Sequence, residues 1–178
     1  MINISTKKGD NGRTSLANGS RISKASLRLD VIGDLDELNS WLGVVVACLN
    51  NKFSEDKKLL IHIQDKLFVI GAELAKAKEL ELDDKLLKDL ETRSLILQKR
   101  LARNWPTKFL LPGGSKQAGW LDLARTVCRR AERSMAKLNQ TEKLRPILLK
   151  TVNRLSDYLY LLRCYVNQEQ GIKEKLKV

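Results

Sequence analysis

The residue types that bind a polyphosphate are concentrated near the N-terminus of this 178-residue chain. Glycines there let the backbone approach a ligand, hydroxyls and free N–H groups donate hydrogen bonds, and lysines supply positive charge. The segment is not a Walker A loop, because G-x-x-x-x-G-K-[ST] does not occur in the sequence. On the residues alone, a phosphate site and a solvated basic tail are both open interpretations. The residues concerned are Thr6, Lys7, Lys8, Gly9, Asp10, Gly12, Thr14, Ser15 and Lys24.

A second set of polar residues lies beside the apolar stripe of a helix predicted over about residues 115–138. At about 100° per residue, Arg125, Arg129 and Glu132 share one flank of that helix, whereas Arg130 points to its back. Half-buried charges need partners, and arginine offers forked donors to phosphate. The flank therefore predicts either an ion-pair network between helices or subunits, or a phosphate site.

Similar polar clusters flank the core stripes of the first and last predicted helices. Asp36 and Asn39 share a flank with Gly43, which would let a neighbour approach closely. Asn153 and Asp157 stack four residues apart on the last helix. On composition alone, such clusters are more typical of a helical bundle with ion pairs at its interfaces than of an enzyme.

The connection over residues 105–114 is apolar, aromatic and bracketed by Pro106 and Pro112. It is unusual for a simple connector, because Phe109, two leucines and a Gly-Gly pair directly precede a helix start at Ser115. Either it folds over the end of the bundle as a hydrophobic plug, or it forms a wall of an apolar ligand pocket. In the second case the helix N-terminus would face an anion.

Hydrophobic periodicity predicts the helices that position these residues, and neither a convincing strand nor an internal repeat is visible. The last helix would begin at Pro146 and end before Gly171. Helices of similar length predict an all-α five-helix bundle in one domain over 1–178, with an N-terminal loop over 1–26, the bundle over 27–171 and a basic tail over 172–178. The five helices are expected at about 27–49, 55–77, 83–103, 115–138 and 146–171.

The net charge of +12 suggests an anionic partner such as a nucleotide, nucleic acid or membrane surface. No zinc finger, RGG tract or aromatic-rich strand supports nucleic acid. No apolar run is long enough to span a membrane, and the N-terminus lacks the apolar region of a signal peptide. We therefore expect a cytoplasmic protein without a nucleic-acid or membrane partner.

The cysteines and the single histidine argue against a metal centre. Cys48, Cys128 and Cys164 fall far apart within helical patterns, which predicts buried free thiols in a reducing compartment. His62 has no nearby cluster of Cys or Glu, which argues against a zinc site or a histidine-based triad. We expect no metal-ligand set among the side chains.

Five ordered blocks together cover nearly the whole chain. Each block alone is weak, but the combination is specific, and it resembles the ATP:cob(I)alamin adenosyltransferases of the propanediol-utilisation type. The blocks are T-K-x-G-D-x-G-x-T from Thr6 with Lys24 beyond it, G-x-x-D-E-L-N-S from Gly33, F-x-x-P-G-G from Phe109, A-R-T-x-x-R-R-A-E-R from Ala124 and N-R-L-S-D-Y-L from Asn153.

The resemblance implies a ferritin-like five-helix bundle that assembles as a homotrimer with active sites between subunits. It implies transfer of the 5′-deoxyadenosyl group of ATP to the cobalt of cob(I)alamin, with release of triphosphate and with Mg²⁺ accompanying the nucleotide. A reductase acting on cob(II)alamin and a cobalamin-dependent enzyme are implied partners. Because Co(I) is itself the nucleophile, the reaction needs no Ser, Cys or His base.

The same resemblance implies roles for individual residues. The N-terminal set named above would hold the ATP phosphates, and residues of the adjoining subunit would complete the site. Asp36 and Arg125 would form an ion pair that links subunits near the corrinoid, and Phe109 would lie against the corrin face and help to keep the lower axial ligand off the cobalt. Phe109, Arg129, Asp36 and Arg125 are thus the expected catalytic set. The residues expected to complete the nucleotide site are Arg129, Arg130, Ala131, Glu132, Arg133 and Asn153.

Three departures from the family pattern affect the expected corrinoid side and the first helix. Asp122 stands where many relatives carry His, and Gly119 and Trp120 replace smaller or different residues. The run before the first helix lacks the usual Asp-Pro-Arg, although Lys24 and Arg28 are present. Two alternatives stay open: a non-catalytic basic bundle that binds nucleotide or nucleic acid, and a family member that delivers the cofactor without making it.

Overall fold

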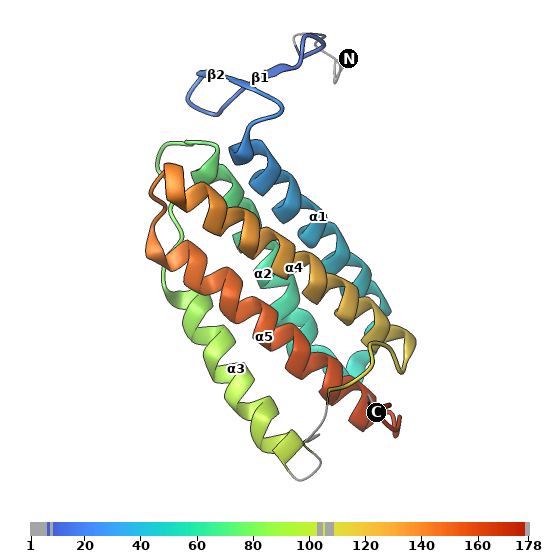
Figure 1. Ribbon diagram of the computed structural model, residues 1–178. Helices are drawn as coiled ribbons and strands as arrows, with labels where there is room; N and C mark the ends of the chain where they lie inside the picture. Colours follow the sequence, from blue (N-terminus) through green and yellow to red (C-terminus); the bar gives the residue numbers. More distant parts are fainter. Residues whose placement is uncertain (1–6, 8, 103–104, 106–108, 177–178) are drawn as a thin grey trace.

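In the computed structural model, which describes residues 7, 9–102, 105 and 109–176, five long helices lie side by side (Figure 1). They are α1 (Leu27–Cys48), α2 (Ser54–Leu74), α3 (Lys85–Leu101), α4 (Lys116–Thr141) and α5 (Pro146–Glu169), with a short 3-10 helix η1 (Asn51–Phe53) before α2. The predicted all-α five-helix bundle is confirmed. The helix α1 packs against α2 and α4, and α5 packs against α4 and α3. Within the described ranges, none of the helices combines the length and the apolarity that a membrane crossing requires.

Each helix buries a stripe of aliphatic side chains at three- and four-residue spacing, as in Val31, Leu35 and Leu38 on α1. The starts of the last two helices follow from local chemistry. The Oγ atom of Ser115 accepts a hydrogen bond from the Ala118 amide at 3.2 Å, which caps α4. Pro146 begins α5, where its missing N–H leaves no hydrogen bond unmade.

The N-terminal region holds a two-stranded antiparallel hairpin, whereas a loop without strands was predicted there. The strands β1 (Arg13–Ser15) and β2 (Arg21–Ser23) pair so that Thr14 lies opposite Ile22. Strands of three residues are too short for an alternating pattern to be detected in the sequence. Figure 1 shows the hairpin beyond the end of the bundle from which α1 starts. Leu16 is buried, and a 2.9 Å hydrogen bond from Ala17 N to the carbonyl oxygen of Ala75, directly after α2, attaches the hairpin to the bundle.

The ends of the middle helices also differ from the prediction by a few residues. The helix α2 ends at Leu74, because Lys76 adopts a positive φ of 61° and the chain turns there. The helix α3 begins at Lys85, and α4 continues to Thr141. Helix ends depend on local capping geometry, which a hydrophobic period does not record.

A buried polar network joins α2, α3 and α5. The guanidinium of Arg93 donates to both carboxylate oxygens of Asp56, at 2.8 and 2.6 Å. The Tyr158 hydroxyl donates to the same carboxylate at 3.0 Å. Asp56 and Tyr158 are fully buried, and burial, followed by the charge of Asp56, raises the pKa of Tyr158 well above its ordinary value.

The three cysteines are free thiols, as predicted. Cys128 and Cys164 are buried, whereas Cys48 is only half-buried. Burial raises the pKa of both buried thiols, so they stay protonated near neutral pH. Their chemistry is that of small apolar core residues.

Candidate active site

The N-terminal strip forms a tight turn in front of the hairpin. The amide of Gly12 donates to Gly9 O at 3.2 Å, and the amide of Lys24 donates to Gly12 O at 2.8 Å. A Cβ atom at Gly9 would lie 3.1 Å from the Lys24 ammonium, so a larger residue there would require the flexible end of Lys24 to shift slightly from the turn. Lys7 and Gly12 have positive φ angles of 58° and 74°. This arrangement of turn and lysine is suited to an anionic oxygen.

The structure therefore brings together several members of the predicted phosphate strip. Asp10 is exposed in the turn, Thr14 is half-buried in β1, and Ser15 accepts from Arg21 Nη1 at 3.4 Å. Thr6 and Lys8, which belong to the same prediction, lie outside the described residues.

A second polar surface lies over α4 and α5, where a hollow of about 400 Å³ opens beside the segment that precedes α4. Phe109, with 85% of its surface exposed, stands at this hollow, so it does not plug the end of its own bundle. Among the alternatives for this segment, its exposure favours a ligand-facing wall. The hollow is lined by Phe109, Leu110, Arg125, Arg129, Ser156, Asp157 and Tyr160.

The two arginines of the hollow have donors to spare. The Nε atom of Arg125 is buried and makes no hydrogen bond, because the nearest carboxylate oxygen, on Asp122, is 3.6 Å away. Its guanidinium lies 6.0 Å from the ring centre of Tyr160. The side chain of Arg129 is 52% exposed and reaches Glu132 only at 4.0 Å. Both cations can therefore take an additional anionic partner.

The remaining residues predicted from this block face different ways. Asn153 Nδ2 donates to Glu132 Oε1 at 2.7 Å, so these two belong to the α4–α5 side. Ala131 is fully buried in the core, and its side chain presents no surface to a ligand. Arg133 is exposed and donates to Arg129 O at 3.3 Å.

Arg130 was predicted to point to the back of α4, and instead it contacts α1. Its Nε atom donates to Asp34 at 2.9 Å, and Nη2 pairs with Glu37. The hydrogen bond with Asp34 is the main reason that its pKa is raised. A helical-wheel analysis that assumes one apolar stripe places Arg130 on the solvent side, but α4 packs against both α1 and α5. Arg130 thus serves contact between helices, while its neighbour Arg129 stays available.

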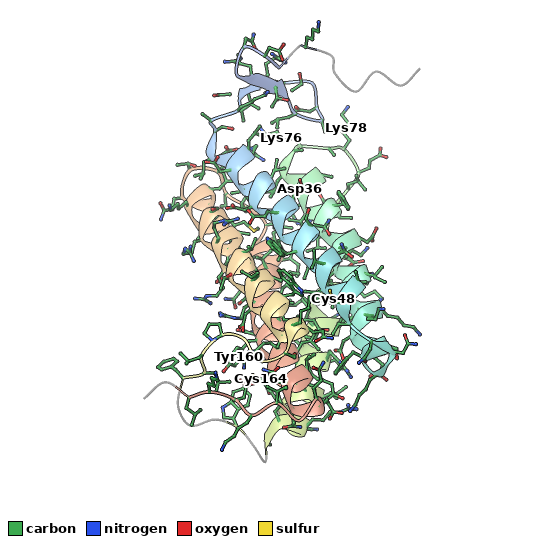
Figure 2. The ribbon with its side chains drawn as sticks, turned by 90° about the vertical axis from the view of Figure 1, so that its right-hand side faces the viewer. Asp36, Cys48, Lys76, Lys78, Tyr160 and Cys164 are labelled. Carbon is green, nitrogen blue, oxygen red and sulfur yellow. The ribbon has the colours of Figure 1, made fainter. Side chains whose placement is uncertain are left out.

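Asp36 and Arg125, predicted as partners, lie on different surfaces of the same chain. Asp36 lines a groove between α1 and α2 together with the exposed ring of Phe68, whereas Arg125 lines the α4–α5 hollow. Figure 2 shows Asp36 nearer the hairpin end of the bundle and Tyr160, of the hollow, nearer the other end. Among the described residues, Asp36 has no ion-pair partner.

Sequence reasoning missed a buried cation close to the hollow. The side chain of Arg163 is 1% exposed and pairs with Asp122 at 3.1 Å. Burial by itself would lower its pKa, but the hydrogen bond with Glu174 and the charge of Asp122 raise the pKa overall. The signal in the sequence was Asp122, a departure from the family pattern that needs a cation once it is buried.

Comparisons with known proteins show the family to which the chain belongs. The family model for cobalamin adenosyltransferase matches residues 4–166. A corrinoid adenosyltransferase of Bacillus subtilis is 39% identical over 176 residues, covering 96% of this chain and 90% of that protein. A cobalamin adenosyltransferase of Cupriavidus metallidurans is 40% identical over 180 residues, covering 96% and 91%.

Solved structures give the same result. A PduO-type ATP:corrinoid adenosyltransferase from Lactobacillus reuteri, a Phe-to-Ala variant complexed with cobalamin and ATP, superposes with a TM-score of 0.91. It is 30% identical and covers 98% of this chain and 99% of its own. The chain belongs to the cobalamin adenosyltransferase family. Within that family, its resemblance to the propanediol-utilisation type is confirmed, and the alternative of a non-catalytic basic bundle is not favoured.

Proposed function

We propose that this protein transfers the 5′-deoxyadenosyl group of ATP to the cobalt of a reduced corrinoid and releases triphosphate. The observation that carries the proposal is the α4–α5 hollow, where an exposed aromatic ring stands beside two arginines with unused donors. Membership of the family and the cobalamin and ATP bound by the Lactobacillus reuteri relative support it.

The reaction places its demands on charge and position. The electron pair of Co(I) attacks C5′, a cobalt–carbon bond forms, and the C5′–O bond breaks with its electrons going to the triphosphate. The nucleophile comes with the substrate, so the chain must orient C5′ and neutralise the leaving group. Lys24 beside Gly9 and the free donors of Arg129 are the groups suited to that charge.

We propose that the working site forms between subunits of a homotrimer. Asp36 and Arg125 lie on different surfaces of one chain, so they can pair only when one copy meets another head to tail. Such a contact would cover the exposed ring of Phe68 and give the guanidinium of Arg125, whose side chain is 23% exposed, a carboxylate partner. The rotation must close after three copies for the assembly to be a ring.

The exposed ring of Phe109 is proposed to lie on the corrin face. An apolar wall there excludes water and the lower axial ligand, which favours reduction to the nucleophilic Co(I) state. Mg²⁺ is proposed to accompany the triphosphate, because it prefers phosphate oxygens and water to a cage of side chains. Asp10, exposed in the N-terminal turn, would be available to it.

The remaining proposals follow from the same chemistry. An electron donor must reduce the cobalt to Co(I), so a reductase is a proposed partner. The adenosylated corrinoid must be used by another protein, so a cobalamin-dependent enzyme is a second proposed partner. A cytoplasmic location stays a prediction.

The test is anaerobic turnover of ATP with chemically reduced cobalamin, followed by the absorbance of the cobalt–carbon product. We expect product with the unaltered chain, and its absence would overturn the proposed function. Phe109→Ala should lower kcat at least about tenfold while leaving the KM for ATP nearly unchanged. Equal losses in kcat and in ATP affinity would show that Phe109 has been given the wrong role.

A further inference from the structure

The segment that follows Phe109 is fastened to α5 by a buried cation that none of the roles above uses. Arg163 Nη2 donates to the carbonyl oxygens of Leu111 and Gly113, at 2.9 and 3.1 Å. Its Nε donates to Asp122 at 3.1 Å, and its Nη1 donates to Glu174 at 2.6 Å. One guanidinium thus joins α4, α5, the Phe109 segment and the C-terminal segment.

Further hydrogen bonds hold the same short stretch of backbone. The Gly113 amide donates to Asp122 at 2.8 Å, and the Ser115 amide donates to Asn167 Oδ1 at 2.9 Å. Gly114 has a φ of 104°, and a Cβ there would lie 2.6 Å from Asn167 Oδ1. The approach is therefore possible only for glycine, and it gives residues 113–115 little freedom to move.

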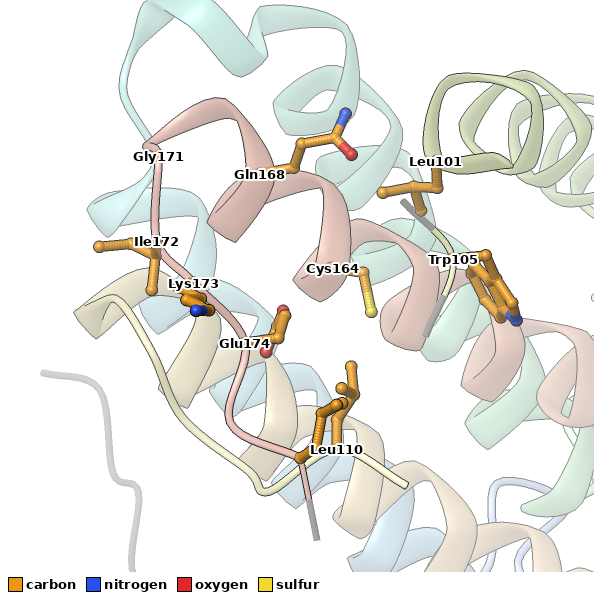
Figure 3. A pocket seen from close by; sticks show the side chains of 10 residues that line it. Leu101, Trp105, Leu110, Cys164, Gln168, Gly171, Ile172, Lys173 and Glu174 are labelled. Atoms are coloured by element: carbon orange, nitrogen blue, oxygen red, sulfur yellow. The ribbon is translucent and has the colours of Figure 1, made fainter. Parts of the chain in front are cut away.

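The C-terminal segment contacts the Phe109 segment directly. The Leu111 amide donates to Lys175 O at 2.8 Å, and Leu110 forms an antiparallel bridge with Leu176. Behind this contact lies a hollow of about 450 Å³, lined mainly by apolar side chains. Figure 3 shows the chain from Gly171 to Glu174 passing along this hollow toward Leu110. The part of the chain predicted as a basic tail is thus a support for the segment before α4.

A buried ion pair contributes little net stability, because desolvation offsets its attraction, but the hydrogen bonds of Arg163 restrict the backbone and side chains that they join. Geometry is what Phe109 needs, because its ring is 85% exposed and is not held by packing in its own chain. The position of that ring depends on the backbone next to it. The backbone that follows Phe109 is hydrogen-bonded to Arg163 through Leu111 and Gly113, and to the C-terminal segment through Leu111.

We infer that Arg163 and Glu174 are positioning residues for Phe109. They hold residues 110–114 in the conformation that presents the ring to the corrinoid, and they couple the C-terminal segment to the reaction. The role rests on the proposed function, because it concerns the same site.

The test uses Glu174→Ala, which removes one partner of Arg163 and leaves Asp122 to balance the buried charge. Glu169→Ala is the matched control, because Glu169 pairs with Lys52 at the same end of α5. Amide hydrogen exchange without substrates should be about tenfold faster at Leu111 and Gly113 in Glu174→Ala than in the control. Unchanged exchange at these two amides would overturn the inference.

The second measurement is kinetic. Glu174→Ala should lower kcat about fivefold to tenfold without raising the KM for ATP, and it should have no further effect in a Phe109→Ala background. Additive losses would show that Glu174 acts without Phe109. Exchange that is faster by the same factor across the whole bundle would reflect a general loss of stability and would overturn the positioning role. Failure of the unaltered chain to form product would overturn the proposed function, whereas equal kcat for the two glutamate variants would overturn only the positioning role.

Discussion

The arginines on the two sides of α5 differ in how many of their hydrogen-bond donors have partners within the chain. On the side of α2 and α3, Arg93 is mostly buried and meets Asp56 through a forked pair of hydrogen bonds. On the side of α4, Arg129 is half-exposed with its carboxylate at 4.0 Å, and Arg125 keeps a buried Nε without a hydrogen bond. Arg93 is thus saturated, whereas the two arginines that line the α4–α5 hollow keep spare donors; Arg163 pairs with Asp122 on the same side but does not line the hollow.

The difference separates folding from function. A cation whose donors are all used within its own chain has none left for a ligand, so its removal should lower the free energy of unfolding. Removal of a cation with unused donors should change the free energy of unfolding little, and it should weaken substrate binding or slow turnover. The following experiments test whether the two sides separate in this way.

The largest effect is expected for Asp56→Ala. The change takes the buried carboxylate from Arg93, leaving it only the exposed Glu55 as a partner, and takes the acceptor from Tyr158, so the free energy of unfolding should fall by about 3–5 kcal/mol. Chemical denaturation measures it. Glu55→Ala is the matched control, because Glu55 also pairs with Arg93 but is 74% exposed; it should cost about 0–1 kcal/mol. Equal losses would contradict the distinction.

Arg129→Ala should act on turnover. Loss of a cation that neutralises the leaving triphosphate should lower kcat/KM about 100-fold, or ~2.7 kcal/mol, with little change in melting temperature. Anaerobic kinetics with ATP and reduced cobalamin measure the effect. Arg130→Ala removes the neighbouring arginine, which pairs with Asp34 and Glu37, so it should lower stability and change turnover only a few-fold. The reverse order would assign the phosphate role to Arg130.

Asp36→Asn should weaken the assembly. If Asp36 pairs with Arg125 of a neighbouring copy, its neutralisation should lower activity about tenfold at low protein concentration, or ~1.4 kcal/mol, and shift sedimentation toward smaller species. Asp30→Asn, an exposed acid on the same helix, is the control and should sediment like the unaltered chain. Identical sedimentation of the two variants would remove Asp36 from the interface.

The smallest effect is a pH dependence on the saturated side. Burial raises the pKa of Tyr158 above the value of 10.0 that it has when unfolded, so the folded chain keeps the phenol proton longer. The stabilisation is complete below pH 10 and is lost as pH rises toward the folded pKa. The slope from this group is at most about 1.4 kcal/mol per pH unit. Denaturation between pH 9 and 11 should therefore show a shallower slope for Tyr158→Phe, and equal slopes would refute it.

The helices could be predicted from the sequence because their apolar residues recur periodically. The hairpin and the contacts of single side chains could not, because they leave no periodic pattern. The five helices follow from stripes of aliphatic residues that recur over many turns, and the flank with Arg125 and Arg129 follows from the same period. The hairpin escaped detection because its strands are three residues long. Arg130 was misplaced because α4 has two packing partners.

Arg163 shows a further limit. It sits among apolar residues of α5, and its partners come from α4, from the segment before α4 and from the C-terminal segment. No local pattern links positions so far apart in the sequence. Asp122 was noticed only because it departs from the family, and its partner became visible only in three dimensions.

The attachment of the hairpin to its own bundle has a genetic consequence. The hydrogen bond from Ala17 to Ala75 holds the turn that contains Gly9 and Lys24 at the end of its own bundle where α1 starts. The turn therefore stays with its own bundle and does not reach across to a neighbouring copy. If a nucleotide lies between that turn and the α4 of another copy, each chain lends one half-site and borrows the other. Two defective alleles, one altered at Lys24 and one at Arg129, would then complement each other, because a mixed ring contains junctions where both intact halves meet.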